Sequence, residues 1–258
     1  MAPSISGRYA DLIEILEADG GIVCLVGAGG KKSTIYHLAS RFHGRVGITS
    51  TVHTPPFRKR LSAQVLVAPE DELRTLVAGA ADSATVAYAC PSDKRARLAG
   101  VSPDLVSDLH ESGGFDLTLV KADGARLRWI KAPGPHEPAL PKRFSTLIPI
   151  VSMRAVGQPL DRTVAHRPGA LAELLGAQPG DRITPEHVAR MLCDVRGGMK
   201  EHERADHVVP VINMVDTDEQ RYTARLIAGQ VLDRSARIER VVLTRMACEN
   251  PVVEIVAR

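Results

Sequence analysis

The chain has 258 residues, of which 44% are apolar and only 3% aromatic, with a formal net charge of +3. This length suits one large α/β domain, and the scarcity of aromatic side chains favours a core of Val, Leu, Ile and Ala in buried parallel strands. The small charge, with no aromatics among the basic clusters, argues against nucleic acid as a partner. No stretch reaches the roughly 18 apolar residues of a membrane span, so we expect no membrane partner and a cytoplasmic location.

Apolar periodicity predicts helices and strands that alternate along most of the chain. We expect helices at residues 9–18, 33–42, 70–78, 104–111, 170–175, 185–193 and 218–232. We expect strands at residues 22–26, 46–50, 84–89, 117–122, 147–151, 208–212 and 238–244. This alternation predicts a single α/β domain over residues 1–258, with a mostly parallel sheet and helices on both faces. Residues 161–203 are expected to form a helical insertion, and residues 52–60 a loop that contains two adjacent prolines.

A glycine-rich segment, GAGGKKST over residues 27–34, lies between the first predicted strand and the helix at 33–42. In this context glycines turn successive backbone N–H groups inward and the helix N-terminus favours an anion. The segment therefore predicts a phosphate-binding loop and a P-loop NTPase-like fold, with ATP or GTP as the ligand. The candidate nucleotide contacts are Gly27, Ala28, Gly29, Gly30, Lys31, Lys32, Ser33 and Thr34.

The match to the pattern GxxxxGK[ST] is incomplete and leaves two registers. If Lys31 is the phosphate lysine, Leu25 stands where the first glycine belongs and Lys32 where the hydroxyl belongs. If Lys32 is the phosphate lysine, Lys31 replaces a glycine. We prefer Lys31 as the catalytic lysine because Gly30 precedes it, and we expect Ser33 or Thr34 to hold Mg²⁺. A tight glycine turn without a ligand is the alternative.

Two later segments carry side chains that a nucleotide site needs. Asp123 follows an apolar strand and precedes Gly124, so we expect it to bind Mg²⁺ and to act in catalysis, although Asp-Gly is also ordinary turn chemistry. The segment from Asn213 to Asp216 resembles the NKxD motif of GTPases, in which the aspartate reads guanine, but Met214 replaces the lysine. Asp216 is therefore either a base contact or, with Thr217, one of two candidates for the cap of the helix that begins near Asp218.

Several segments together resemble the YqeC-like family. They are GAGGKKST at 27–34, TSTVH at 49–53, KADGAR at 121–126, KAPGPHEP at 131–138, VGQPL at 156–160 with His166-Arg167, and residues 213–216. The resemblance runs over nearly the whole chain, and ADG followed by KxPxxHEP is its most specific part. It implies a P-loop NTPase-like fold in an accessory protein for selenium-dependent molybdenum hydroxylases. The implied activity is that of an NTPase or phosphoryl-transfer enzyme in selenium or molybdenum cofactor maturation, with a molybdenum hydroxylase or maturation proteins as partners.

Two lysines depart from the family pattern. Lys32 stands where the family has a hydroxyl, and Lys121 stands where it usually has an acidic residue. Both changes remove oxygen ligands or negative charge from the expected Mg²⁺ side and add charge that favours an anion. A nucleotide- or cofactor-binding carrier without turnover is therefore an alternative to an enzyme. A docking scaffold for a molybdenum enzyme is a third hypothesis.

The loop that follows Asp123 contains Lys131, His136 and Glu137. Ligands of open α/β sheets bind beyond the carboxyl ends of the strands, so we expect these side chains to contact a second substrate, such as a small phosphoryl acceptor. The alternative is a surface loop stiffened by its prolines. The spacing of His53, His136 and His166 does not indicate a metal site.

Overall fold

The computed structural model describes residues 11–58 and 61–258. Strand β1 (Gly21–Gly27) illustrates how the sequence builds the core, because its apolar side chains alternate between the two faces of a sheet. Ile22, Cys24 and Val26 join one apolar cluster. Val23 and Leu25 join a second cluster on the opposite face. A strand buried on both faces reads as a continuous apolar run, which is the pattern seen in the sequence.

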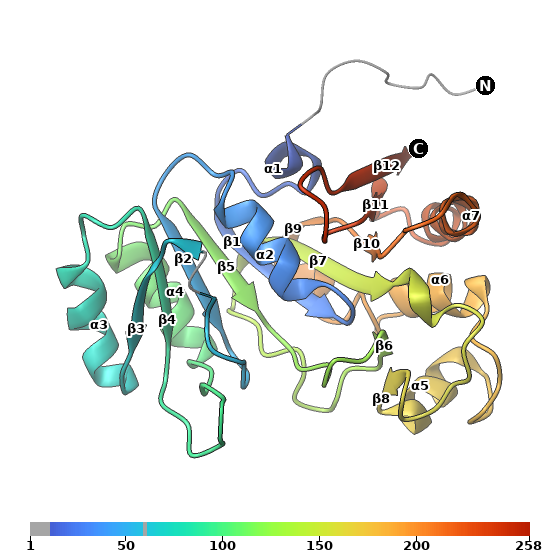
Figure 1. Ribbon diagram of the computed structural model, residues 1–258, viewed down its shortest axis with the longest axis horizontal. Helices are drawn as coiled ribbons and strands as arrows, with labels where there is room; N and C mark the ends of the chain where they lie inside the picture. The colour runs from blue at the N-terminus through green and yellow to red at the C-terminus, as the bar shows by residue number, and fades with distance from the viewer. Residues whose placement is uncertain (1–10, 59–60) are drawn as a thin grey trace.

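The described residues form a ten-stranded sheet and a separate pair of short strands, β6 (Ile130–Lys131) and β8 (Ala165–His166). The large sheet has the order β12-β11-β10-β7-β1-β5-β2-β4-β3, with β9 beside β7 (Figure 1). All of its pairs are parallel except β11 with β12. Besides β1, its strands are β2 (Val46–Ser50), β3 (Gln64–Val67), β4 (Thr85–Ala89), β5 (Leu117–Lys121), β7 (Phe144–Ser152), β9 (Ala205–Val208), β10 (Val211–Asn213), β11 (Arg240–Thr244) and β12 (Val252–Ala257).

Helices cover both faces of the sheet (Figure 1). Helices α1 (Leu12–Ile15) and α2 (Lys31–Ala39) pack on one face. The other helices join the cluster on the opposite face: α3 (Glu70–Gly79), α4 (Pro103–Ser112), α5 (Pro168–Leu175), α6 (Pro185–Cys193) and α7 (Asp218–Arg234). Two short 3₁₀ helices span Met153–Ala155 and His202–Arg204. The predicted α/β class, with a mostly parallel sheet covered on both faces, is confirmed and is consistent with a P-loop NTPase-like architecture.

Most predicted elements are present, and the differences have local causes. The strand expected at 208–212 is two strands, because Val209 and Pro210 separate β9 from β10 and a proline donates no backbone hydrogen bond. The sequence reading missed β3 and β12, which lie at the two edges of the sheet. Residues 9–10 of the first predicted helix and residues 59–60 of the predicted loop lie outside the described residues. No described helix is long and apolar enough to span a membrane.

Segment 161–203 contains α5 and α6, as expected of a helical stretch. The apolar faces of both helices belong to the same cluster as α7 and the strands. Capping supports the start of α6, where Thr184 and His187 form a reciprocal capping box. The predictions of one domain over the whole chain, and of an insertion at this segment, stay predictions.

Parallel strands bring the polar ends of distant segments to one edge of the sheet. Leu25 of β1 is level with Lys121 at the end of β5, which is also level with Ser50 at the end of β2. On the other side, Asn213 at the end of β10 is level with Ser152 at the end of β7. The glycine loop leaves β1 at this same carboxyl edge, where ligands of open α/β sheets bind.

Candidate functional site

The glycine loop is short and packs tightly against β7. Only Ala28, Gly29 and Gly30 separate β1 from α2. Gly27 and Gly29 have φ values of +88° and +85°, in the left-handed region that favours glycine. A Cβ on Gly27 would lie 2.2 Å from the carbonyl oxygen of Ile150. The glycines are therefore required by the close approach of the loop to β7, whatever ligand the loop binds.

Backbone N–H groups of this loop are free to bind an anion. Gly27 N–H donates to Asp123 Oδ2 at 2.8 Å, and Ala28 N–H donates to the Ile150 carbonyl at 2.7 Å. The next N–H groups, of residues 29–33, have no acceptor in the part of the chain that the structure describes. They lead into the first turn of α2, where the helix dipole adds partial positive charge. A row of unpaired donors at a helix N-terminus favours an anionic ligand.

The side chains of Lys31 and Lys32 point in different directions and contact different segments. Lys31 is 6% exposed; its ammonium donates to the Gly27 carbonyl and lies 2.8 Å from Asp123 Oδ1. Burial lowers the pKa of Lys31, and the charge of Asp123 opposes this effect. Lys32 donates instead to the carbonyls of Pro55 and Pro56, at 3.3 and 3.2 Å, and lies over the ring of Tyr36. The structure thus brings Lys31, and not Lys32, to the carboxylate that follows β5.

Asp123 and Glu137 share the ammonium of Lys131. Lys131 Nζ lies 2.9 Å from Asp123 Oδ2, 2.7 Å from Glu137 Oε2 and 2.8 Å from the Gly124 carbonyl oxygen. Arg167 holds the same Glu137 oxygen at 2.6 Å. Although burial raises the pKa of Glu137, the hydrogen bonds and charges of Lys131 and Arg167 lower it to about 2. Loop residues 131–137 are therefore tied to the Asp123 strand end by ionic contacts.

Lys121 is a buried amine without a carboxylate partner. It is 9% exposed, and its ammonium donates to the His53 carbonyl at 3.1 Å. It forms no ion pair within residues 11–58 and 61–258. Burial, followed by the positive charge of Lys31, lowers the pKa of Lys121 to about 7. An anion beside this amine would restore its usual preference for the charged form.

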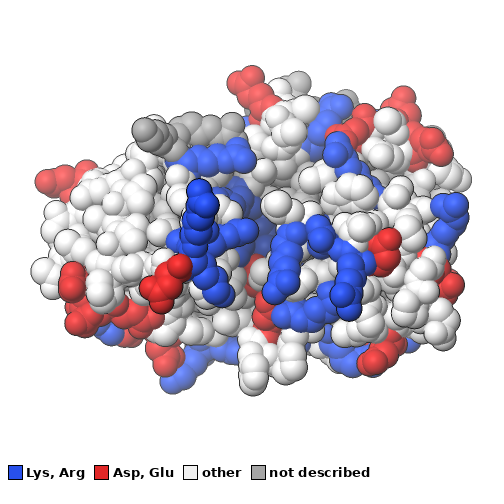
Figure 2. Space-filling model, turned by 60° about the horizontal axis from the view of Figure 1, so that its bottom comes forward, with Lys and Arg blue, Asp and Glu red and all other residues white. Residues whose placement is uncertain are grey.

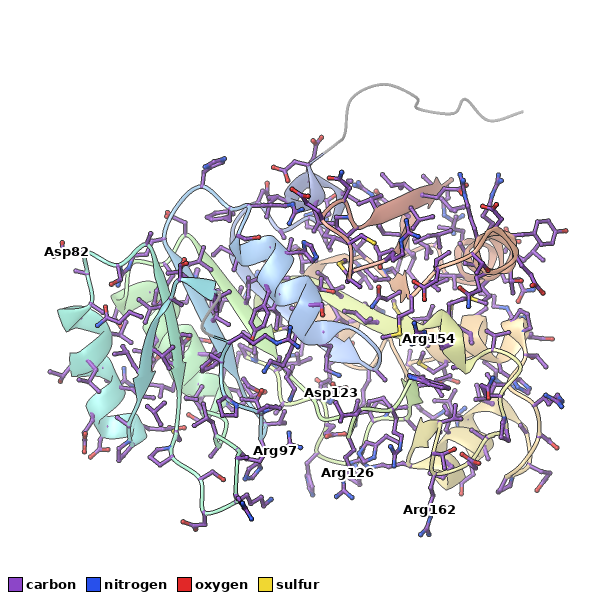
Figure 3. The ribbon with its side chains drawn as sticks, viewed as in Figure 1. Asp82, Arg97, Asp123, Arg126, Arg154 and Arg162 are labelled. Atoms are coloured by element: carbon purple, nitrogen blue, oxygen red, sulfur yellow. The ribbon has the colours of Figure 1, made fainter. Side chains whose placement is uncertain are left out.

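Positive charge exceeds negative charge at this edge of the sheet. Three lysines, Lys31, Lys121 and Lys131, are buried together, and we call them the lysine cluster. Its carboxylates are Asp123 and Glu137, and Glu137 is shared with an arginine. Lys and Arg side chains gather in two groups across the middle of this face (Figure 2). Figure 3 shows Asp123 below the start of α2, with Arg97 and Arg126 at the same edge and Asp82 at the opposite end.

The residues expected to bind Mg²⁺ make other contacts. Both oxygens of Asp123 lie against ammonium groups, and Oδ2 also accepts from Gly27 N–H. Thr34 is buried and donates to the Gly30 carbonyl at 3.3 Å, whereas Ser33 is half-buried. No group of three or more His, Cys, Asp or Glu residues suited to a metal occurs in the described residues. Mg²⁺ requires octahedral oxygen ligands, so this donor set does not fit it as arranged. The magnesium site stays a prediction.

The segment from Asn213 to Asp216 lies at the same edge. Asn213 is buried, and its Nδ2 donates to the Gly29 carbonyl at 2.7 Å. The Asp216 carboxylate pairs with Arg154 at 3.0 Å, and Thr217 is the N-cap of α7 with a capping box to Gln220. The helix cap is therefore made by Thr217. The role of Asp216 as a base contact stays a prediction.

Residues that the sequence reading did not select complete the loop around Glu137. Lys200 donates to the carbonyls of Gly134, Pro135 and Glu137, and Arg167 pairs with the Glu137 carboxylate. His136 is exposed. In the sequence, Arg167 could have been selected because it belongs to the His-Arg pair that precedes Pro168. A non-glycine residue with φ of +62° marks backbone strain there. For Lys200 the sequence offers no comparable signal.

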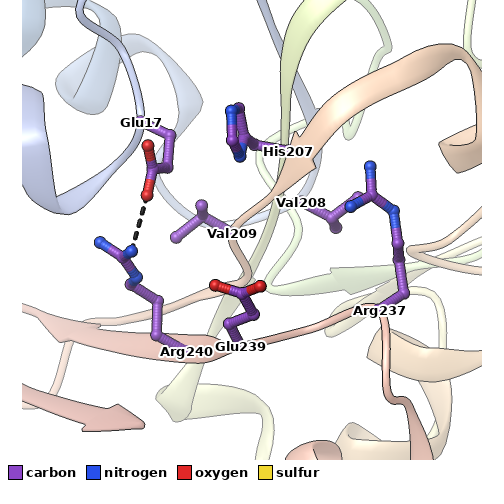
Figure 4. Close-up of a pocket in the computed structure, with 7 residues that line it drawn as sticks. All are labelled: Glu17, His207, Val208, Val209, Arg237, Glu239 and Arg240. Carbon is purple, nitrogen blue, oxygen red and sulfur yellow. Dashed lines mark ion pairs between the residues drawn. The ribbon is translucent and has the colours of Figure 1, made fainter.

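A small pocket lies away from this chemistry. It is lined by Glu17, His207, Val208, Val209, Arg237, Glu239 and Arg240 (Figure 4). These residues come from the amino end of the sheet, and Glu17 pairs with Arg240 at 2.6 Å across the pocket. A second hollow, which includes Asp104 and Lys142, also lies at the amino end. Neither hollow meets the glycine loop, so we place the candidate site on the charged carboxyl edge.

Comparisons with known proteins match the part of the chain that builds this site. The sequence model of the family described as YqeC protein matches residues 23–169. A relative in Escherichia coli (strain K12) that bears the YqeC name is 25% identical over 184 residues, which span 69% of this chain and 70% of the relative. No solved structure matches the chain. The matched range includes the glycine loop, the lysine cluster, Glu137 and Arg167, whereas Asn213 and Asp216 lie beyond it.

Proposed function

Because the chain belongs to the YqeC family, we propose that it is a nucleotide-binding accessory protein for molybdenum hydroxylases, which holds ATP or GTP by its phosphates at the carboxyl edge of the sheet. One observation carries the phosphate part of this proposal. The unpaired N–H groups of residues 29–33 lie next to the lysine cluster, where positive charge exceeds negative charge. A polyphosphate supplies both the acceptors and the charge that this edge lacks.

The residues have distinct roles in this proposal. Lys31 and the free N–H groups bind the phosphates nearest to α2. Lys121 supplies charge from the neighbouring strand end, and Asp123 orients Lys31 through their 2.8 Å contact. Asp216 would have to leave Arg154 in order to contact a base. Catalysis at such a site is mostly positioning and charge stabilisation of the transferring phosphoryl group.

A phosphoryl acceptor, if the protein is a transferase, would bind beside the loop that contains Lys131, His136 and Glu137. His136 is exposed and available to a substrate, whereas the Lys131 ammonium is already surrounded by three oxygens. This difference favours His136 as the residue of the loop that contacts a second substrate. The buried Lys131 and the half-buried Glu137 hold the loop in place through their ion pair.

The alternative is a carrier that binds nucleotide without turnover. The contacts of Lys32 favour it, because this lysine occupies the position of the usual hydroxyl and is held by the carbonyls of Pro55 and Pro56. Assays of phosphate release from ATP and GTP, run beside calorimetric binding, separate the two functions. Binding with release supports an enzyme, and binding without release supports the carrier.

Calorimetric titration of ATP, GTP and inorganic triphosphate tests the site itself. We expect wild type to bind, and Lys31→Met to lose at least about tenfold in affinity because a charged hydrogen bond is removed. Lys142→Met is the matched control, since Lys142 is exposed at the amino end of the sheet. If none of the three ligands binds to wild type, or if the two variants behave alike, the phosphate site is wrong.

The role in molybdenum hydroxylase maturation rests on the family resemblance and has its own test. A strain that lacks this chain should make molybdenum hydroxylase protein with reduced activity and reduced selenium content. Restoring wild type should recover both, and restoring Lys31→Met should not. Full activity and selenium content in the deletion strain would remove this part of the proposal while leaving the binding result intact.

A further inference from the structure

Asp123 is placed as the metal-binding carboxylate of a P-loop site would be, at the end of the strand beside β1. A cation already lies there. Lys131 Nζ lies between Asp123 Oδ2 and Glu137 Oε2, at 2.9 and 2.7 Å, and its third contact is the Gly124 carbonyl at 2.8 Å. An ammonium has three N–H donors, and three oxygens surround this one. Its contacts with Glu137 and Gly124 are hydrogen bonds, and its contact with Asp123 is an ion pair.

Burial and pairing make this a built feature. Lys131 is 1% exposed and Asp123 is 1% exposed. The remaining Asp123 oxygen faces Lys31 at 2.8 Å, and Arg167 holds the far carboxylate, Glu137. A divalent ion would have to displace one of these ammonium groups to reach a carboxylate oxygen. Displacement would leave a buried lysine without its partner, which costs several kcal/mol.

We propose that Lys131 takes the place of the divalent cation, so that the protein binds the polyphosphate of its ligand as the metal-free anion. The inference rests on the phosphate site proposed above and specifies the ionic form of its ligand. Lys131 fixes the Asp123 carboxylate, which in turn holds the Lys31 ammonium. The charge of the bound anion is then neutralised by Lys31, by Lys121 and by the free N–H groups of the loop. Mg²⁺ reduces the negative charge of a polyphosphate, so it competes with these groups instead of assisting them.

The decisive measurement is the affinity of wild type for inorganic triphosphate, with EDTA and again with excess Mg²⁺. We expect binding in EDTA and affinity weaker by about tenfold or more when Mg²⁺ saturates the ligand. Binding that appears only with Mg²⁺ would overturn the inference and leave the phosphate site standing. Absence of binding in both conditions would overturn the phosphate site together with this inference.

A second measurement addresses the occupant directly. Titration of Mn²⁺ alone, followed by electron paramagnetic resonance, should show no tight site in wild type and a new site in Lys131→Met, where the ammonium between the two carboxylates is removed. Lys142→Met is the control and should resemble wild type. A Mn²⁺ site in wild type that Asp123→Asn removes would overturn the inference, as would a folded Lys131→Met that gains none. If Lys131→Met does not fold, the triphosphate titrations of wild type in EDTA and in excess Mg²⁺ still test the inference.

Discussion

Asn213 Nδ2 donates to the Gly29 carbonyl across 2.7 Å, although the two residues are 184 positions apart in the chain. The other end of the same amide accepts from Thr244 Oγ1 at 3.1 Å and from Met246 N–H at 3.0 Å. One buried side chain therefore joins the end of β10, the glycine loop and the turn after β11. We expect this contact to help orient the free N–H groups of the loop.

Asn213→Ala should both destabilise the protein and weaken binding of inorganic triphosphate. Two buried groups, of Thr244 and Met246, and the partly buried Gly29 carbonyl would lose their partner. Each buried unsatisfied group costs about 1–3 kcal/mol, although relaxation and water reduce the sum. Urea denaturation measures the change in the free energy of unfolding, and calorimetry measures the change in affinity. Asn250→Ala is the control because Asn250 is exposed. Equal stability of the two variants would show that the Gly29 contact contributes little.

The sequence predicted the parts of the site that depend on one strand and the loop after it. Gly27 to Lys31 follow a buried strand, and Asp123 follows another, so both were expected at one edge of a parallel sheet. The ionic contacts of the site could not be predicted from the sequence. Arg167 reaches Glu137 across 30 positions, and Lys131 meets Asp123 only because the chain reverses after Gly124. Such pairings depend on loop paths, which hydrophobic periodicity does not specify.

The same limit explains the strands that the sequence reading missed. Strand β3 lies at the edge of the sheet and is largely exposed, so its four residues show no clear alternation of buried and exposed side chains. Strand β12 at the other edge also lacks a fully buried face. An edge strand packs on fewer neighbours than a central one and therefore gives a weaker apolar pattern. The central strand β2, buried throughout, was predicted with the bounds that the structure shows.

Gly27→Ala should cost much more stability than Gly157→Ala. Both glycines have positive φ, +88° and +80°, so both substitutions carry the strain of a left-handed alanine, which is about 1 kcal/mol. Only at Gly27 would the new Cβ meet backbone, at 2.2 Å from the Ile150 oxygen, whereas nothing lies within 4 Å at Gly157. Thermal and urea unfolding of both variants gives the difference in their free energies of unfolding, which is the contribution of the clash at Gly27. Similar losses would mean that the loop can move away from β7.

Anion binding should weaken as the pH rises through about 7. The pKa of Lys121 is lowered to about 7, so its amine is charged below that pH and neutral above it. Sulfate is a suitable probe because its own charge is constant between about pH 6 and about pH 8. We expect calorimetric affinity for sulfate to fall over this range in wild type.

Lys121→Met should remove most of that pH dependence, while Lys142→Met should keep it. Some dependence will remain near pH 8, because burial and the charges of Arg58 and Arg97 lower the pKa of Lys32 to about 8. If the slope survives in Lys121→Met at full size, the titrating group is not Lys121. An affinity that rises with pH in wild type would contradict the sign of the prediction.

Glu137→Gln should alter how the free energy of unfolding depends on pH in the acidic range. The pKa of Glu137 is lowered from 4.5 to about 2 in the folded protein, so the carboxylate contributes stability above about pH 4.5 that is lost as the pH falls through about 2. The contribution is at most about 3.5 kcal/mol, because each pKa unit between 4.5 and about 2 corresponds to about 1.4 kcal/mol. Urea denaturation at a series of pH values measures it.

The difference between wild type and Glu137→Gln is the informative quantity, because other carboxylates also titrate in this range. Wild type should be the more stable protein at neutral pH, and the two curves should converge as the pH falls through about 2, below which Glu137 is protonated in both states of wild type. Glu249→Gln, at an exposed position, should follow wild type throughout. Parallel curves for wild type and Glu137→Gln would show a loss of packing, whereas convergence shows that Lys131 and Arg167 stabilise the charge itself.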